Sequence, residues 1–451
     1  MRKKNMFDTD ESSTPSVESQ DSEPPSRLRP ACPPHNFNNS NLPDFADPGD
    51  WKWQIKNRIR SLDQFEKYFP GSNSQQMNEV SRKFPMAITP YYASLIRRPD
   101  ISDPVFAMAV PQPRELIDPL FLSDDPLSED EDMPVPGMVH RYRDRVLLIA
   151  TTMCSMYCRH CTRKRIAGAR ESSISAQRIR QVTEYLMAHP EVSDVIVSGG
   201  DPLTMNDGSI EMVLSSLRSV PSVQVIRIGT RVPVVLPMRI TDGLVNILKK
   251  YHPLWINTHF NHPNEITPQA KEACAKLADA GIPLGNQTVL LAGVNDDAKI
   301  IEQLCRGLIQ TRVRPYYLYQ CDLVRGVEHF RTSIRKGMEI MEYLRGRVGG
   351  IAIPTFVVDA PHGGGKIPVL PNYIVSMSPS HTVLRNYEGL FVNYPEPSAK
   401  PAVDNTTSTG KIGVWELASG KTSVIAPAKN HHIKRRERYA GQNKTAYLFE
   451  P

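Results

Sequence analysis

The feature that most constrains the fold is an alternation of β-rich runs with amphipathic helical runs, from about residue 140 to residue 360. Several helical runs begin with Thr or Ser and end near Gly or Pro, as helix ends do. Strands that alternate with helices are typical of parallel β/α units. We therefore expect an α/β fold, a partial (β/α)6-type parallel barrel. The predicted strands are 145–152, 194–200, 223–230, 254–260, 283–291, 314–320 and 350–359.

The segments around this barrel differ from it in composition. Residues 1–48 are rich in Ser, Pro, Asp and Glu and poor in large apolar side chains, so we predict a disordered N-terminal extension. Residues 49–135 carry helical patterns and form a predicted N-terminal helical region. The barrel core is predicted over 136–369. Residues 370–451 form a C-terminal region with some strand character and a basic run at 429–438.

Composition excludes some classes of protein. The chain has 451 residues and a net charge of +6, which is mild for this size and does not require a nucleic-acid partner. No apolar run reaches the roughly 20 residues that span a bilayer. The basic N-terminus has no apolar stretch behind it, so we expect no secretory signal, no membrane anchor and a cytoplasmic protein.

Three of the seven cysteines, Cys154, Cys158 and Cys161, follow the first predicted strand with the spacing C-x3-C-x2-C. Active sites of parallel β/α barrels lie at the carboxyl ends of the strands. Three thiolates can hold three irons of a [4Fe–4S] cluster and leave the fourth iron open. A zinc site with His160 as the fourth ligand is the alternative.

This motif after the first strand of a barrel resembles the signature of the radical S-adenosylmethionine enzymes. The resemblance implies a [4Fe–4S] cluster on the three cysteines and S-adenosylmethionine on the open iron, which is cleaved to a 5′-deoxyadenosyl radical. The second strand ends in Ser198, Gly199, Gly200 and Asp201, where glycines let the backbone approach a ligand closely. The resemblance implies that this edge contacts the methionine amino group, and a plain turn is the alternative.

Polar residues also mark two later strands. Asn257, His259 and His262 follow the fourth strand, and Gln287 lies in the fifth, where side chains at strand ends suit the lining of an active site.

The last strand leads into a glycine-rich loop. Asp359 ends this strand, and Gly363–Gly365 precede Lys366. A phosphate loop would need Ser or Thr after the lysine, but Ile367 follows, so we do not expect a nucleoside triphosphate. A lysine placed in this way can instead hold pyridoxal 5′-phosphate through a Schiff base.

Residues 51–395 resemble the lysine 2,3-aminomutase family in many dense blocks, such as "CSMYCRHCTRKR", "IRIGTRVPVVLPMRIT", "NTHFNHPNEIT" and "PTFVVDAPHGGGKIPVLPNY". The resemblance implies that L-lysine is converted to L-β-lysine by migration of its amino group from C2 to C3. It also implies an electron donor such as flavodoxin or ferredoxin, and a homo-oligomer built through the C-terminal region.

The resemblance also assigns roles to residues. Lys366 would carry pyridoxal phosphate, with Arg141 and Arg145 near its phosphate. Arg163 would bind the substrate α-carboxylate, for which its planar fork is suited. His259 and Gln287 would line the S-adenosylmethionine pocket. The substrate ε-ammonium would be bound by two carboxylates, those of Asp322 and Asp359.

Two carboxylates would repel the side chain of glutamate, so glutamate is disfavoured as a substrate. Arginine stays open, because a guanidinium also pairs with carboxylates. Two further readings stay open. One is a radical enzyme that acts on tRNA or protein through the basic run, and the other is a non-catalytic iron–sulfur or zinc protein.

The chain departs from the family pattern at several places. Asp297 stands where some family members have a zinc-binding cysteine, and no cysteine follows Cys321, so we predict no structural zinc. His362 replaces an expected glycine close to Lys366. We expect residues 1–48 and the tail after about 397 to have no match in the family.

Overall fold

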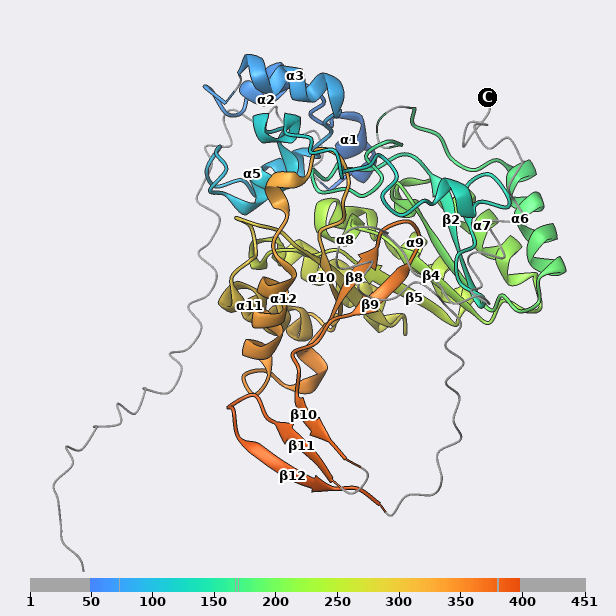
Figure 1. Ribbon diagram of the computed structural model, residues 1–451. Helices are drawn as coiled ribbons and strands as arrows, with labels where there is room; N and C mark the ends of the chain where they lie inside the picture. Colours follow the sequence, from blue (N-terminus) through green and yellow to red (C-terminus); the bar gives the residue numbers. More distant parts are fainter. Residues whose placement is uncertain (1–48, 73, 167, 169, 379–380, 398–451) are drawn as a thin grey trace, which may run out of the picture. The chain divides into compact units, whose positions relative to one another are not determined.

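The computed structural model describes residues 49–397 except 73, 167, 169 and 379–380 (Figure 1). The predicted disordered extension, residues 1–48, lies outside the described residues. So do the tail beyond 397 and the basic run in it. Within the described part of the chain, no helix has the length and apolar character needed to cross a bilayer.

A curled sheet of nine strands in sequence order organises the molecule. Its seven central strands, β2 to β8, pair in parallel, each with the next along the chain. At the two edges β1 (Met138–Val139) pairs antiparallel with β2, and β9 (Gly365–Pro368) pairs antiparallel with β8. No pairing joins β1 to β9 among the described residues, so the barrel is open. The expected partial barrel of six β/α units is confirmed.

The strands lie close to their predicted positions. The run predicted at 350–359 begins its strand only at Thr355, because Pro354 has no N–H to donate. The first residues of the predicted strand instead form a short 3-10 helix, Gly350–Ala352. The parallel strands are β2 (Arg145–Thr151), β3 (Asp194–Gly199), β4 (Val225–Gly229), β5 (Leu254–Thr258), β6 (Leu284–Leu290), β7 (Arg314–Gln320) and β8 (Thr355–Ala360).

Helices connect the parallel strands and lie along the outside of the sheet (Figure 1). Most have a Ser, Thr, Asn or Asp N-cap that accepts backbone N–H bonds. Asp297 is one of these caps and accepts from the N–H of Lys299 at 2.7 Å. The helices are α6 (Ala176–Ala188), α7 (Asp207–Arg218), α8 (Val232–Val235), α9 (Asp242–Leu248), α10 (Pro268–Asp279), α11 (Ala298–Gln310) and α12 (Ile334–Leu344).

Short helices form the region that precedes the barrel. The helical pattern at 51–69 is interrupted, because Ile59 exchanges backbone hydrogen bonds with Ile88 at 2.8 and 3.0 Å. The side chain of Arg58 is buried here and binds Glu171 and the Cys154 carbonyl, which ties this region to the cysteine loop. The helices are α1 (Trp51–Lys56), α2 (Leu62–Glu66), α3 (Gln75–Lys83), α4 (Pro90–Ala93) and α5 (Pro104–Ala109).

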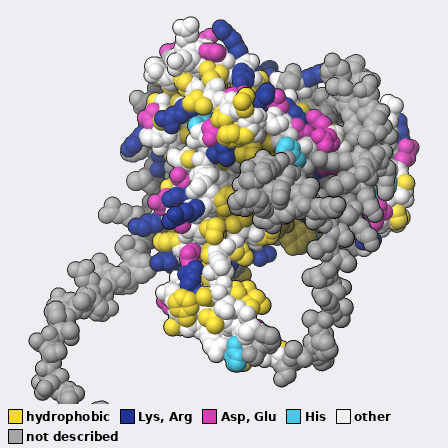
Figure 2. Space-filling model, in the orientation of Figure 1, with side chains coloured by type: hydrophobic (Ala, Val, Ile, Leu, Met, Phe, Trp, Pro, Cys, Tyr) yellow, Lys and Arg dark blue, Asp and Glu magenta, His cyan; other side chains and the backbone are white. Residues whose placement is uncertain are grey.

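A second, antiparallel sheet follows the barrel. It consists of β10 (Ile374–Met377), β11 (His381–Arg385) and β12 (Phe391–Pro395). Arg385 binds Glu342 of α12 at 2.6 Å and links this sheet to the barrel. Hydrophobic side chains gather on its surface (Figure 2).

Candidate active site

A cavity of about 680 Å³ lies inside the curled sheet. All the side chains and glycines that the resemblance assigns to cofactors or substrate line it, so the topology brings together residues spread over about half of the chain. They are Arg141, Arg145, Cys154, Cys158, Cys161, Arg163, Ser198, Gly199, Gly200, Asp201, His259, Gln287, Asp322, Asp359 and Lys366. His262, expected to suit the lining, does not line the cavity; its Nδ1 accepts the Asn264 N–H at 3.1 Å.

The cysteine loop begins directly after β2 and is anchored on both sides of Cys158. The N–H of Tyr157 donates to the Ala87 carbonyl at 2.9 Å. The buried Arg159 pairs with the buried Glu115 at 2.6 Å. These bonds hold the loop without using a thiol, so the sulfur atoms stay available.

The arrangement of donors fits an iron–sulfur cluster better than a single zinc ion. Ligands of one zinc lie about 2.3 Å from the metal and therefore close to one another. In the described part of the chain, no three His, Cys, Asp or Glu side chains are arranged to hold one ion. His160 instead contacts the Asn261 amide at 3.3 Å. Three thiols that each hold a different iron of a cube do not need to converge on one point.

The thiols need a positive partner to ionise. Burial, and then the charges of Cys161 and Asp201, raise the pKa of Cys154 well above its usual value. Burial and Cys158 raise the pKa of Cys161 to about 11. Iron would supply the compensating positive charge, because metal binding displaces thiol protons.

Arg231, which the sequence did not single out, touches the cluster site. It follows β4, is buried, and its Nη1 donates to the Cys158 Sγ at 2.7 Å. Its Nη2 donates to Glu265 at 2.7 Å and to the Tyr92 hydroxyl at 3.2 Å. The guanidinium is thus held in place on the sulfur.

The glycines at the end of β3 are required by a close approach of their backbone to the end of β2 and the cysteine loop. A Cβ on Gly199, whose φ is +123°, would lie 2.3 Å from the Thr151 carbonyl oxygen. A Cβ on Gly200 would lie 2.3 Å from the Met153 carbonyl oxygen. Packing alone therefore demands glycine here, beside any role in ligand contact.

Asp201 is engaged within the protein. Its Oδ1 accepts from Thr230 at 2.6 Å and from the Leu203 N–H at 3.1 Å, and its Oδ2 accepts from the Arg231 N–H at 2.7 Å. Burial raises its pKa to about 6 despite these bonds. The carboxylate joins the ends of β3 and β4 and thereby fixes the backbone of Arg231.

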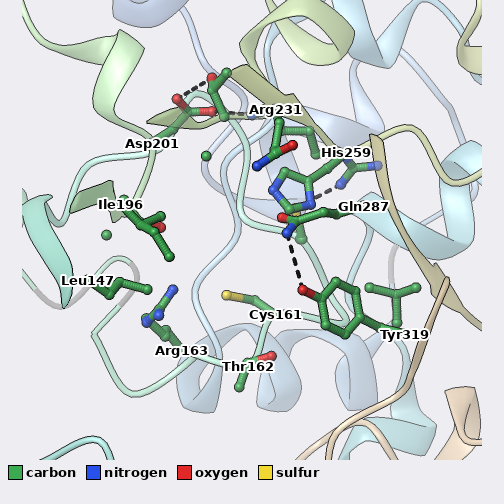
Figure 3. Close-up of a pocket in the computed structure, with 18 of the residues that line it drawn as sticks. Leu147, Cys161, Thr162, Arg163, Ile196, Asp201, Arg231, His259, Gln287 and Tyr319 are labelled. Carbon is green, nitrogen blue, oxygen red and sulfur yellow. Dashed lines mark hydrogen bonds between the residues drawn. The ribbon is translucent and has the colours of Figure 1, made fainter. Parts of the chain in front are cut away.

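His259 and Gln287 lie beside each other on the wall of the cavity, with Cys161 and Arg163 facing the same space (Figure 3). Burial, and then the charge of Arg231, lower the pKa of His259 to about 4, so its ring is neutral at physiological pH. Gln287 donates from Nε2 to the Tyr319 hydroxyl at 3.1 Å.

Lys366 reaches the cavity from β9. Its Nζ lies 3.0 Å from both carboxylate oxygens of Asp359 and 5.2 Å from the centre of the Tyr319 ring. Its backbone N–H donates to the Tyr142 hydroxyl at 3.0 Å. The register of β8 with β9, which sets Asp359 opposite Lys366, produces this contact.

Asp322 follows β7, is partly buried and lies near Asp359. Burial, and then the charge of Asp359, raise its pKa to about 7, while a hydrogen bond from Thr162 and the charge of Lys366 oppose the rise. Two carboxylates and one ammonium leave this end of the cavity with an excess of negative charge.

Arg163 forms a two-bonded ion pair with Glu129, at 3.0 and 2.7 Å. Arg141 is similarly engaged, with Asp132 at 3.0 Å and with the Leu127 carbonyl.

The other predicted phosphate contact is more open. Arg145 lies 3.8 Å from the centre of the Tyr142 ring and 3.0 Å from Asp144. Among the described residues only its Nη1 has a hydrogen-bond partner, so its other guanidinium N–H groups can donate to an anion.

The sequence analysis did not identify three residues of the site. For two of them the sequence carries a weak indication, and for the third it carries none. Arg231 directly follows a strand, and Tyr319 lies in an aromatic strand, so both positions were accessible to a strand-end argument. Glu129 lies in the acidic stretch "SEDED", where sequence alone does not distinguish it from its neighbours.

Comparisons with known proteins agree with this geometry. The family model described as "Radical SAM superfamily" matches residues 148–304. The model described as "Lysine-2,3-aminomutase" matches residues 341–450. The expectation that the tail after about 397 has no match in the family was therefore wrong. The match extends almost to the end of the chain.

Curated relatives match over most of the chain. The L-lysine 2,3-aminomutase of Clostridium subterminale is 50% identical, over 86% of this chain and 96% of that protein. The enzyme of the same name from Methanococcus maripaludis is 53% identical, over 86% and 94%. The glutamate 2,3-aminomutase of Clostridioides difficile is 46% identical, over 79% and 84%.

Proposed function

We propose, because this chain belongs to the lysine 2,3-aminomutase family of radical S-adenosylmethionine enzymes, that it converts L-lysine to L-β-lysine. The lysine-named relatives from Clostridium subterminale and Methanococcus maripaludis cover more of the chain, at higher identity, than the relative named for glutamate. The charges of the cavity support the same substrate.

The single observation that carries the proposal is the pair of carboxylates at one end of the cavity and the arginine on its wall. Asp322 and Asp359 suit a cationic side chain, since an ammonium can donate to both. Arg163 suits the α-carboxylate. The cavity therefore offers a cation for the α-carboxylate and two carboxylates for a terminal cation of one amino acid.

The cofactors have candidate partners among these residues. Cys154, Cys158 and Cys161 would hold the cluster, and Lys366 would hold pyridoxal phosphate. When bound, the cluster and S-adenosylmethionine supply a carbon radical, and pyridoxal phosphate supplies the π-system through which nitrogen migrates.

The side chains of the cavity prepare it for this chemistry. Asp359 binds the Lys366 ammonium at 3.0 Å, and its carboxylate would become available to the substrate ammonium once Lys366 holds pyridoxal phosphate and loses that charge. The neutral ring of His259 and the amide of Gln287 offer hydrogen bonds without adding charge.

Three further points belong to the proposal. We propose a cytoplasmic location and a one-electron donor such as flavodoxin or ferredoxin, because the cluster must be reduced before it can act. We also propose a homo-oligomer that uses the C-terminal region, 370–451. The exposed apolar side chains of β10 to β12 support it, because patches of this kind mark contact surfaces. We also propose the domain boundaries expected from the sequence: an N-terminal extension over 1–48, a helical region over 49–135 and the barrel core over 136–369.

Anaerobic turnover tests the proposal directly. The protein is reconstituted with iron and sulfide, supplied with pyridoxal phosphate, S-adenosylmethionine and dithionite, and offered L-lysine, L-arginine or L-glutamate. We expect β-lysine, and loss of product in the Lys366→Ala variant. β-Arginine alone would overturn the substrate, and 5′-deoxyadenosine without any β-amino acid would favour a macromolecular substrate.

A further inference from the structure

We propose that Glu129 is a positioning residue that orients the Arg163 guanidinium toward the α-carboxylate of the substrate. The inference rests on the proposed function, which assigns Arg163 to that carboxylate. Glu129 is 4% exposed and lies on the segment before the barrel, and Arg163 lies just after the cysteine motif. Both residues line the cavity.

The two bonds of the pair use one edge of the guanidinium. Nε donates to Oε2 at 3.0 Å, and Nη2 donates to Oε1 at 2.7 Å. Nη1 has no hydrogen-bond partner among the residues that the structure describes. A guanidinium has donors along more than one edge, so a second carboxylate can bind through Nη1 while Glu129 stays in place. Glu129 thus fixes the plane of the Arg163 guanidinium and leaves the edge that contains Nη1 available to a ligand.

The position of Glu129 is itself fixed by its neighbours. Ser128 has a φ of +53°, a left-handed conformation that is costly for a residue other than glycine. Strained residues persist only where the surrounding structure determines them. Arg165 pairs with Asp125 at 3.3 Å and with Asp130 at 3.0 Å, which clamps both sides of Glu129.

The charge state of the pair supports a permanent bond. Burial alone would raise the pKa of Glu129, but Arg163 and then Arg165 lower it to about 2. The carboxylate is therefore ionised throughout the physiological range.

A competing interpretation is that Glu129 occupies the substrate carboxylate site and must leave. The two interpretations predict opposite changes in affinity for the substrate carboxylate when Glu129 is replaced. Removal of a positioning residue weakens recognition of the substrate carboxylate, whereas removal of a competitor strengthens it. The free Nη1 edge favours positioning, because the ligand does not have to displace Glu129.

Equilibrium binding distinguishes the two without turnover. Radiolabelled L-lysine and L-lysinamide are dialysed against the holoenzyme with pyridoxal phosphate and S-adenosylmethionine but no reductant. Lysinamide keeps the α-amine and the ε-ammonium and lacks only the carboxylate charge, so the ratio of the two Kd values reports carboxylate recognition. The variants are Glu129→Gln, Glu129→Asp and the matched control Asp124→Asn, which neutralises an exposed carboxylate of the same segment that pairs with Arg325 at 3.1 Å.

We expect the wild type and Asp124→Asn to prefer lysine over lysinamide by at least tenfold. In Glu129→Gln the preference should fall at least fivefold, with lysinamide affinity and iron content unchanged. The preference of Glu129→Asp for lysine should lie between those of the wild type and Glu129→Gln. If Glu129→Gln does not fold, Glu129→Asp tests the proposal in its place. An unchanged preference, tighter lysine binding, or an equal loss for both ligands would overturn the proposal. A wild type without any preference would instead refute the role of Arg163 in the proposed function.

Discussion

At the scale of single residues, Asp322 is the titrating group that matters most for binding a cationic substrate. Its pKa is raised to about 7 by burial and then by Asp359, with a smaller contribution from Glu129. Thr162 and Lys366 act in the opposite direction. Because the pKa lies above the ordinary value near 4, the carboxylate that attracts an ammonium forms only as the pH rises through about 7.

This shift predicts the pH dependence of catalysis. We expect kcat/KM for L-lysine, which reports the free enzyme, to fall about tenfold per pH unit below pH 7. Thr162→Val removes a hydrogen bond that lowers the pKa, so the inflection should move to higher pH. The measurement is initial rates between pH 5.5 and 9, with iron content checked at each pH. A flat profile, or an inflection that moves to lower pH in Thr162→Val, would contradict this role of Asp322.

His362 lies in the glycine-rich loop at a φ of +57°, and its N–H donates to the Pro126 carbonyl at 3.2 Å. The left-handed conformation explains why glycine suits this position. Relief of this conformation is worth about 1 kcal/mol. We therefore expect His362→Gly to be more stable than His362→Ala by about that amount in urea unfolding. Equal stabilities would show that the loop relaxes without strain.

At the scale of secondary-structure elements, the ends of neighbouring strands support one another. Asp201, after β3, accepts the backbone N–H of Arg231, after β4, and the Arg231 side chain then reaches Cys158 in the loop after β2. Three consecutive parallel strands thus set one N–H···S hydrogen bond. Hydrogen bonds to cluster sulfurs are among the factors that set the reduction potential.

Loss of this bond should make the cluster harder to reduce. We expect Arg231→Gln to shift the midpoint potential to a more negative value, since a positive charge and a donor to the thiolate are removed. The measurement is a redox titration of the reconstituted protein followed by electron paramagnetic resonance. Arg306→Gln, at an exposed position on α11, is the control. An unchanged midpoint with a full iron content would refute the effect.

At the scale of the whole molecule, the sheet of β10 to β12 stands out because its apolar side chains stay exposed. Val392 is 45% exposed and Tyr394 is 56% exposed, and they lie on one strand two residues apart. Alternate residues of a strand point to the same face, so both extend one surface. Such a surface is expected to be covered in an assembly.

Charges on this surface should weaken the proposed homo-oligomer. We expect the double variant Val392→Glu with Tyr394→Glu to have a lower molar mass in light scattering after size-exclusion chromatography. Met187→Glu changes an exposed apolar residue on α6 and should leave the mass unchanged. Equal masses for the wild type and the double variant would argue against this sheet as the contact surface.

The sequence by itself determined the barrel, the cysteine loop and Lys366. Strand and helix periodicity, glycine-rich turns and thiol spacing are local properties, so they can be read along the chain. The tertiary structure alone decided which charges meet. Glu129 and Arg163 are far apart in sequence, as are Arg231 and Cys158, and no local pattern marks these partners. Their pairing, and the raised pKa of Asp322 beside Asp359, arise because a curled parallel sheet gathers the ends of its strands around one cavity, where charges removed from bulk water interact more strongly.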